Sequence, residues 1–180
     1  MDIRESHPVV TGCLCVFFIQ SLFAEPPFEV LRSCIDEKPK NSSVSLLEIN
    51  NGYYQPQVED KCENQYEIKF NKKIFGSVTC NETPYLLINN QKINLTKAIN
   101  KSVNPEIKPG ILYPTDTSWL KIDFKNQSFL CLNGPISLSG TGSNIGQYYI
   151  IENAFSDKNA PVVYFYFLNK DVVPLTSAHF

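Results

Sequence analysis

The side chains with the clearest chemistry in this sequence are its cysteines. Six are present among 180 residues, and two of them, Cys13 and Cys15, lie in an apolar N-terminal stretch. The other four are Cys34, Cys62, Cys80 and Cys131. Four cysteines in an exported chain indicate two disulfides, with three possible connectivities. Spacing does not decide among them, but we favour Cys34–Cys62 and Cys80–Cys131, because each bond then closes a loop within its own segment. Unpaired buried cysteines are the alternative.

Asn-X-Ser/Thr sequons, which accept N-linked glycans in exported proteins, are a second kind of candidate site. Chance would produce about two of them in a chain of this composition. The sequence contains five, at Asn41, Asn81, Asn94, Asn100 and Asn126. Asn81 is the least favourable, because Pro84 directly follows its threonine. The excess agrees with the even number of cysteines, so we expect a glycosylated protein.

Catalytic and metal-binding residues find little support. Histidine occurs only as His7 and His179, near the two ends, so a Ser-His or Cys-His pair lacks a base. No CxxC pair is present to hold zinc. Carboxylates such as Glu67 and Asp123 alternate with apolar residues, where solvation explains them, and a glycosidase-like acid pair is the remaining enzymatic alternative. Residues 140–143 are glycine-rich but lack the lysine of a phosphate loop. We therefore predict no enzyme, no cofactor and no metal site.

The N-terminus has the pattern of a secretory signal peptide. Its apolar centre is too short and too interrupted to span a bilayer, and a small residue, Ala24, precedes a Glu-Pro-Pro stop. We therefore predict a signal peptide over residues 1–24, cleaved after Ala24. The leading stretch is not clearly positive, because Asp2 and Glu5 accompany Arg4. A buried core strand is the alternative interpretation.

The composition excludes several other classes. Apolar residues make up 43% of the chain, which is enough for a packed core. With 16 basic and 18 acidic residues the net charge is −2, so no basic face for nucleic acid is indicated. No later segment reaches membrane-spanning length, and the expected C-terminal tail, residues 170–180, has no hydrophobic anchor. We expect a soluble secreted product.

Period-2 alternation predicts strands through most of the chain. The clearest case is residues 120–125, where apolar and charged side chains alternate after the single tryptophan, Trp119. Similar runs, separated by turn residues, occur at residues 66–70, 74–80, 85–88, 93–96, 129–132, 136–138, 144–150 and 162–168. The last run is apolar on both faces, as in a central strand covered on both sides or an edge that meets a partner. No helical periodicity longer than two turns is evident, and residues 97–117 have the prolines of a long loop.

These runs predict an all-β fold, a two-sheet antiparallel sandwich over residues 66–169 that closes around Trp119. Residues 25–65 differ, with prolines and mixed charges. Residues 44–49 favour a strand and residues 50–52 a turn, which predicts an N-terminal hairpin. We expect this extension to be attached to the main body through disulfides of Cys34 and Cys62.

Three motifs resemble the immunoglobulin superfamily. Trp119 begins a strand like strand C, residues 136–138 resemble strand E, and Gly146-Gln147-Tyr148 resembles the element that places a corner tyrosine in strand F. The similarity covers residues 66–168. Ile150 stands where the strand F cysteine belongs, so the usual inter-sheet disulfide is missing. The chain is most similar to divergent V-like domains of lymphocyte adhesion receptors and to the immunoglobulin-like glycoproteins secreted by cytomegaloviruses and adenoviruses.

The resemblance implies a secreted glycoprotein that binds a protein partner, either as a viral decoy for an immune receptor or ligand or as a subunit of a viral envelope complex. Tyrosine is enriched at interfaces, and the candidate partner-binding residues are Tyr149, Tyr164 and Tyr166. We expect the sequons to lie away from this aromatic region, and a sequon in its middle counts against the hypothesis. The alternative function is a lipid carrier with a cavity between its sheets, which a closed core would disfavour.

Overall fold

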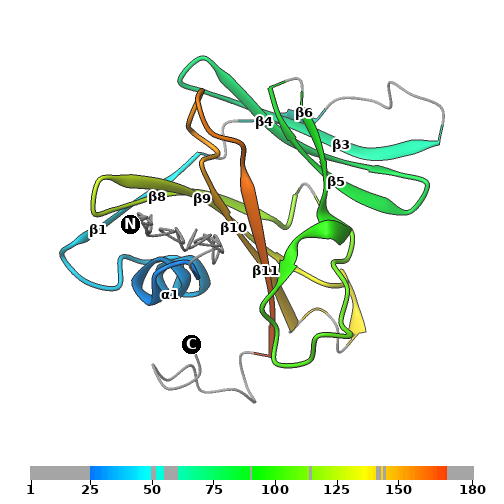
Figure 1. The fold of residues 1–180 in the computed structure, drawn as a ribbon. Helices are drawn as coiled ribbons and strands as arrows, with labels where there is room; N and C mark the ends of the chain where they lie inside the picture. Colours follow the sequence, from blue (N-terminus) through cyan, green and yellow to red (C-terminus); the bar gives the residue numbers. More distant parts are fainter. Residues whose placement is uncertain are drawn as a thin grey trace, which may run out of the picture.

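The computed structural model describes residues 25–49, 52–54, 61–89, 91–113, 115–140, 143 and 145–169. The predicted signal peptide, residues 1–24, and the predicted tail, residues 170–180, lie outside the described residues. Within the described ranges the chain forms two β-sheets, one α-helix and a short 3-10 turn (Figure 1).

The two sheets contain six and five strands, in the orders β1-β8-β9-β10-β11-β7 and β2-β3-β4-β5-β6. The elements are α1 (Phe28–Asp36), β1 (Val44–Glu48), β2 (Gly52–Tyr54), β3 (Cys62–Phe70), β4 (Lys73–Cys80), β5 (Thr83–Ile88), β6 (Gln91–Asn94), η1 (Leu95–Lys97), β7 (Ile99–Asn100), β8 (Ser118–Phe124), β9 (Gln127–Pro135), β10 (Ile145–Glu152) and β11 (Val162–Asn169). Neighbouring strands are antiparallel except β7 and β11, which are parallel. The predicted all-β, two-sheet sandwich is confirmed.

Tight hairpins connect consecutive strands in both sheets. Three of them have two-residue loops in which both residues have positive φ, namely Asn71-Lys72, Asn81-Glu82 and Lys125-Asn126. Positive φ at both positions is the type I′ geometry, which matches the twist of the flanking strands and which asparagine tolerates better than most residues. The asparagines that punctuate the sequence therefore set the strand registers.

The strand order differs from the one that the motif resemblance implied. Strands β8 to β11 run as a consecutive antiparallel meander, so β9 lies between the strand of Trp119 and the strand of Tyr148. Residues 136–138 form no strand: β9 ends at Pro135, and the Ile136 N–H donates to the Ile145 carbonyl. The short apolar run was a hairpin connection, which sequence pattern cannot distinguish from a strand of three residues.

The predicted N-terminal hairpin is also wrong. Strand β1 pairs with β8 in the six-stranded sheet, whereas β2 pairs with β3 in the five-stranded sheet. The chain therefore passes from one sheet to the other between Ile49 and Gly52. Residues 25–65 supply α1, two strands and the start of β3, so they contribute to both layers of the sandwich.

Helix α1 was not expected, although its pattern is present in the sequence. It spans nine residues, about 2.5 turns at roughly 3.6 residues each. Its buried face carries Val30, Leu31, Cys34 and Ile35. Pro27 precedes its first turn, and Glu37, in the left-handed region, ends it with its N–H donating to the Ser33 carbonyl. A helix this short is marginal by itself, so its packing on the sheet decides that it forms.

The core between the sheets is centred on Trp119, whose side chain is fully buried. The Tyr66 ring lies 6.2 Å from the indole, across the two sheets. The other large, fully buried members of this cluster are Ile49, Ile68, Phe75, Leu86, Tyr149 and Phe165. The prediction that the sandwich closes over Trp119 is confirmed.

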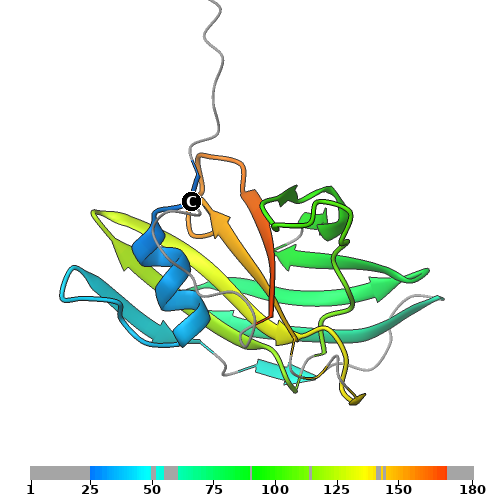
Figure 2. The same ribbon diagram turned by 90° about the horizontal axis from the view of Figure 1, so that it is seen from below.

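A second core lies on the opposite face of the six-stranded sheet, beneath α1 (Figures 1 and 2). Leu31 and Cys34 of the helix pack there with Ile122 of β8 and Tyr148 of β10. The six-stranded sheet is thus covered on both faces. This explains why residues 162–168 of β11 are apolar on both faces.

The predicted disulfide pairing is wrong. Cys34 of α1 bonds Cys131 of β9, and Cys62 of β3 bonds Cys80 of β4. The two bonds span 97 and 18 residues, with Cα–Cα distances of 5.8 and 4.0 Å. The prediction assumed that each bond closes a loop within its own segment, whereas Cys34–Cys131 joins the helix to a strand far along the chain. The predicted bond between Cys34 and the main body exists, with a different partner.

Candidate functional site

The predicted partner-binding tyrosines do not form a surface. Tyr149, Tyr164 and Tyr166 are all fully buried. Tyr149 lies in the core between the sheets, where its hydroxyl donates to the Gln147 Oε1 at 3.1 Å, whereas Tyr164 and Tyr166 belong to the core beneath α1. Because the six-stranded sheet is covered on both faces, alternation along β10 and β11 sends every aromatic side chain into a core.

The environment of these phenols is apolar enough to keep them neutral. Burial raises the pKa of Tyr149 and of Tyr166 above the ordinary tyrosine range. Burial, with the carboxylates of Glu152 and Glu25 nearby, raises the pKa of Tyr164 to about 12. They act as core residues, and the prediction of a docking surface at these positions is wrong.

A sequon also lies beside these strands, contrary to expectation. Asn100 of β7 pairs with Phe165 of β11. Its Nδ2 donates to the carbonyls of Pro105 and Ile107 at 3.1 and 2.8 Å, and its Oδ1 accepts from the Ser102 N–H at 2.9 Å. The Asn100 amide thus holds the long loop to the edge of the six-stranded sheet.

The outer face of the five-stranded sheet is the surface that α1 leaves open, since α1 lies on the far side of the molecule (Figure 1). Alternation along β4 and β5 places Phe75, Leu86 and Ile88 in the inter-sheet core and turns the residues between them outward. The outward set forms a small cluster around the Cys62–Cys80 disulfide. We call this the stapled face, made of Cys62, Val78, Cys80, Tyr85, Leu87 and Lys92.

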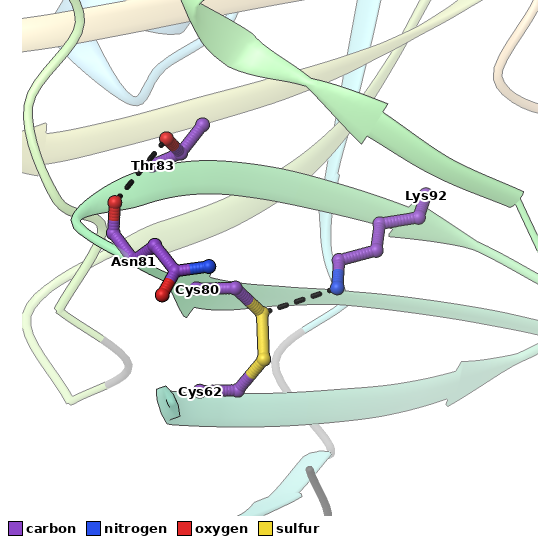
Figure 3. Close-up of a disulfide and its surroundings, with 5 residues drawn as sticks. All are labelled: Cys62, Cys80, Asn81, Thr83 and Lys92. Carbon is purple, nitrogen blue, oxygen red and sulfur yellow. Dashed lines mark hydrogen bonds between the residues drawn. A yellow bond between two sulfur atoms is a disulfide. The ribbon is translucent and has the colours of Figure 1, made fainter. Parts of the chain in front are cut away.

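The stapled face combines apolar contact area with a cation. Val78 is buried there, while Tyr85, its partner across the strands, and Leu87 are half-buried. Lys92, on the edge strand β6, is exposed and reaches back over the sheet. Its Nζ lies 3.1 Å from the Cys80 Sγ (Figure 3). The same Nζ lies 4.8 Å from the centroid of the Tyr85 ring. The ammonium group is therefore in contact with both the disulfide and an aromatic face.

A β-bulge and a glycine shape this face. The register of β3 against β4 shifts between Glu63 and Tyr66, which brings the β3 backbone close to Gly76. A Cβ on Gly76 would lie 2.2 Å from the Tyr66 carbonyl oxygen, so the site admits only glycine. Gly76 itself is buried between Glu67 and Leu87, its neighbours across the strands.

Two of the predicted glycosylation sites border the stapled face. Asn81 is exposed in the β4–β5 turn beside the disulfide, where its N–H donates to the Lys61 carbonyl and its own carbonyl accepts from the Thr83 hydroxyl (Figure 3). Asn94 lies opposite Tyr85, and its Oδ1 accepts from the N–H and the hydroxyl of Thr96. Asn41 and Asn126 are exposed on the other sheet, in the loop before β1 and the β8–β9 turn. Glycosylation at all five sequons stays a prediction.

The contact between Lys92 and Cys80 has no signal in the sequence. The two residues are connected only because β4, β5 and β6 are neighbours in that order, which places β6 within reach of β4 for a long side chain. The cysteines themselves were predicted as disulfide residues, and that is confirmed for Cys34, Cys62, Cys80 and Cys131.

A surface hollow of about 360 Å³ lies at the other sheet, between the β8–β9 turn and the loop after β10. Glu152 is the one acid among its described lining residues, and partial burial raises the pKa of that carboxyl. The remaining lining residues are amides, serines and phenylalanines. The hollow therefore does not contain the pair of carboxylates that glycoside hydrolysis needs.

Two wider features of the described residues bear on the class of protein. No group of three or more histidine, cysteine, aspartate or glutamate side chains in the described ranges is placed to hold a metal ion. Within the same ranges, no helix has the length and apolar content that crossing a bilayer requires.

A scan against protein-family models and searches of curated proteins and of solved structures found no match.

Proposed function

We propose that this protein is a secreted, N-glycosylated β-sandwich that binds another protein through the stapled face. The observation that carries the proposal is the make-up of that face. A buried valine and half-buried Tyr85 and Leu87 lie on the outer surface of the five-stranded sheet, with Lys92 beside them. An apolar, aromatic centre with charge towards the rim is the usual anatomy of a protein interface.

The face is large enough for such a partner. The five strands contain 3, 9, 8, 6 and 4 residues, and with about 3.4 Å per residue and about 4.8 Å between strands their projected area is roughly 490 Å². A standard interface buries about 800 Å² of each partner's accessible surface. The accessible surface of a sheet face is larger than its projected area, because the side chains stand out from the backbone. The mode of action would be steric, because occupying a partner's surface needs no chemistry.

The sequons and disulfides support an exported setting for this binding. Two disulfides are typical of small extracellular domains. Glycans at Asn81 and Asn94 would border the disulfide end of the stapled face. Glycans at Asn41 and Asn126 would shield the six-stranded sheet. We infer a partner that is the ectodomain of an immune cell-surface protein from the resemblance to V-like adhesion domains and viral secreted glycoproteins, which the two-sheet architecture supports.

A lipid carrier is less well supported. The space between the sheets is filled by large side chains, among them Trp119, Phe75 and Phe165, all fully buried. A carrier needs a cavity at this place, and these rings occupy it. We therefore do not propose lipid transport.

The test is capture of cell-surface ectodomains from a defined library by the secreted protein, followed by affinity measurement with two matched variants. Leu87→Arg places a charge on the stapled face, and Leu47→Arg makes the same change on β1 of the other sheet, where Leu47 is 52% exposed. We expect Leu87→Arg to weaken binding by about 30-fold or more, as at an interface centre, and Leu47→Arg to leave it unchanged. The reverse ranking would place the interface elsewhere, and co-purified lipid with no protein ligand would restore the carrier hypothesis.

A further inference from the structure

We propose that the Cys62–Cys80 bond is a thiol-exchange site, which an external dithiol reductant opens while Cys34–Cys131 stays closed. The proposal is independent of the binding function, because it concerns the chemistry of the disulfide itself. Three observations support it: the slight exposure of Cys62 and Cys80, against none for Cys34 and Cys131, the position of the bond within one sheet, and the ammonium group of Lys92.

The two disulfides differ in access. Cys62 and Cys80 are 4 and 7% exposed, whereas Cys34 and Cys131 are both 0% exposed. Cys34 and Cys131 lie in the core between α1 and the six-stranded sheet, so a reductant reaches them only after the helix detaches. Cys62 and Cys80 lie on the outer face of the five-stranded sheet, in a small cluster separate from both larger cores.

The Cys62–Cys80 bond also joins residues that are direct partners on neighbouring strands. Opening it leaves the rest of β3 and β4 paired, from Tyr66–Ser77 to Phe70–Lys73. Exchange at this site therefore needs no disruption of the inter-sheet core.

Lys92 determines which sulfur leaves. Its Nζ is 3.1 Å from the Cys80 Sγ, close enough to stabilise negative charge on that sulfur (Figure 3). Thiol–disulfide exchange is faster when the departing thiolate is stabilised, and a neighbouring lysine is a recognised source of that stabilisation. The expected point of attack is therefore Cys62, with Cys80 as the leaving group.

The reaction proceeds in two displacements. A thiolate of the external dithiol attacks the Cys62 Sγ, forms a new sulfur–sulfur bond and releases the electron pair of the broken bond onto Cys80 as a thiolate beside Lys92. The second thiolate of the dithiol then attacks the dithiol sulfur that is bonded to Cys62. This forms the disulfide of the oxidised dithiol and releases Cys62 as a thiolate, which takes a proton from water. The dithiol loses two electrons and the protein disulfide gains two.

The consequence lies in the end of β3. Beyond the bulge, this end pairs with β4 only through Cys62–Cys80 and Glu63–Thr79, with the Lys61 carbonyl accepting from the Asn81 N–H. Reduction removes the covalent part of this attachment. The disulfide end of the stapled face then separates from β4 more readily, which makes the shape of the face sensitive to extracellular thiols.

The experiment treats the purified, oxidised protein at neutral pH with dithiothreitol and, separately, with thioredoxin. Newly formed thiols are blocked with iodoacetamide at timed intervals, and peptide mass spectrometry then gives the reduced fraction of each disulfide. We expect Cys62–Cys80 to open at least about tenfold faster than Cys34–Cys131. Equal rates for the two bonds would overturn the proposal. With glutathione in place of the dithiol, the expected adduct is on Cys62, and an adduct mainly on Cys80 would contradict the role of Lys92.

Matched lysine variants separate the effect of Lys92 from a general change in stability. Lys92→Gln should slow opening of Cys62–Cys80 by about three- to tenfold, whereas Lys92→Arg and Lys97→Gln, an exposed lysine on the same edge, should leave it near the wild-type rate. The rate at Cys34–Cys131 reports global unfolding in every variant. An unchanged rate in Lys92→Gln, with Cys34–Cys131 still closed, would show that the ammonium does not assist exchange.

Discussion

The two sheets each hold one disulfide, and the two bonds differ in nearly every physical respect. Cys34–Cys131 spans 97 residues, is fully buried and fastens a helix to a sheet. Cys62–Cys80 spans 18 residues, keeps 4 and 7% of its two residues exposed and joins neighbouring strands. In the chain-entropy account, loops of these lengths contribute about 4.7 and about 3 kcal/mol to stability. The first bond therefore maintains the architecture, whereas the second is local and is the one that we propose for thiol exchange.

The two sheets also differ in how many of their faces are buried in a core. The six-stranded sheet has a core on each face, so its aromatic side chains serve packing. The five-stranded sheet has one face in the inter-sheet core, and its outer face carries, among the described residues, only the small cluster around the Cys62–Cys80 disulfide. Interaction surfaces need side chains that the fold itself does not use, and the described residues provide them on the five-stranded sheet.

Among substitutions that test this difference, removal of the Cys34–Cys131 disulfide should have the largest effect. We expect Cys34→Ala with Cys131→Ala to lower the free energy of unfolding by about 4 to 5 kcal/mol, against about 3 kcal/mol or less for Cys62→Ala with Cys80→Ala. Urea denaturation followed by tryptophan fluorescence measures both, because the single indole, Trp119, is fully buried. Equal losses, or a larger loss for the pair on the stapled face, would contradict the division between an architectural and a local bond.

A second, smaller effect is expected from substitution of Gln147, a buried polar residue in β10 of the six-stranded sheet. Gln147 is fully buried; its Nε2 donates to the carbonyls of Ile111 and Pro135, and its Oε1 accepts from the Gly110 N–H and the Tyr149 hydroxyl. Gln147→Leu leaves these groups without partners and should cost about 3 kcal/mol of unfolding free energy.

The matched control for this substitution lies on the other sheet. Gln65 of β3 is half-buried and donates to the Glu67 carboxylate at 3.1 Å. Gln65→Leu should cost less than about 1 kcal/mol, because water can replace that bond. Similar losses for both variants in chemical denaturation would show that the two sheets do not differ in how they use buried polar groups.

The smallest effect concerns an ion pair at the surface of the six-stranded sheet. Partial burial alone would raise the pKa of Asp123, but hydrogen bonds from Lys121, Ser128 and Ser45 hold it below its usual value of 3.8. A lowered folded-state pKa means that the carboxylate stabilises the fold above pH 3.8 and that this contribution is lost as the pH falls through the folded-state value. The carboxylate is 42% exposed, so solvent screening limits the gain to less than about 1 kcal/mol.

The measurement is the unfolding free energy of wild type and Asp123→Asn at pH 7 and pH 3. We expect the variant to be less stable by a few tenths of a kcal/mol at pH 7, roughly the worth of a surface ion pair, with the difference shrinking at pH 3. A difference that grows at pH 3 would mean that the carboxylate is not the stabilised form.

Much of the fold could be predicted because its signals are local. Alternation in β8 predicted both a strand and its two faces, and asparagine at the hairpin tips predicted where strands turn. Trp119 was predicted in the core because the single tryptophan begins the clearest series of predicted strands. The short helix escaped because nine residues contain too few turns for periodicity to rise above chance, although Leu31, Cys34 and Ile35 carry the pattern.

The candidate site could not be predicted, because it depends on which strands become neighbours. Tyr149, Tyr164 and Tyr166 have the composition of a binding surface, yet the second core beneath α1 buries two of them. No sequence pattern connects Lys92 with Cys80, yet the two side chains are in contact. Sequence spacing did not decide the disulfide partners, since it contains no information on the packing of α1 against β9, and the assumption of bonds within each segment was wrong.

The sequence by itself determined the secondary structure of most strands, the hairpin registers, the sandwich class and the four cysteines that form bonds. These follow from side-chain alternation and from the backbone preferences of single residues, which act over a few positions. Only the tertiary structure decided the disulfide partners, the two-sided burial of the six-stranded sheet and the exposure of the stapled face. Those depend on contacts between residues far apart in the chain, and such contacts arise when whole faces pack together.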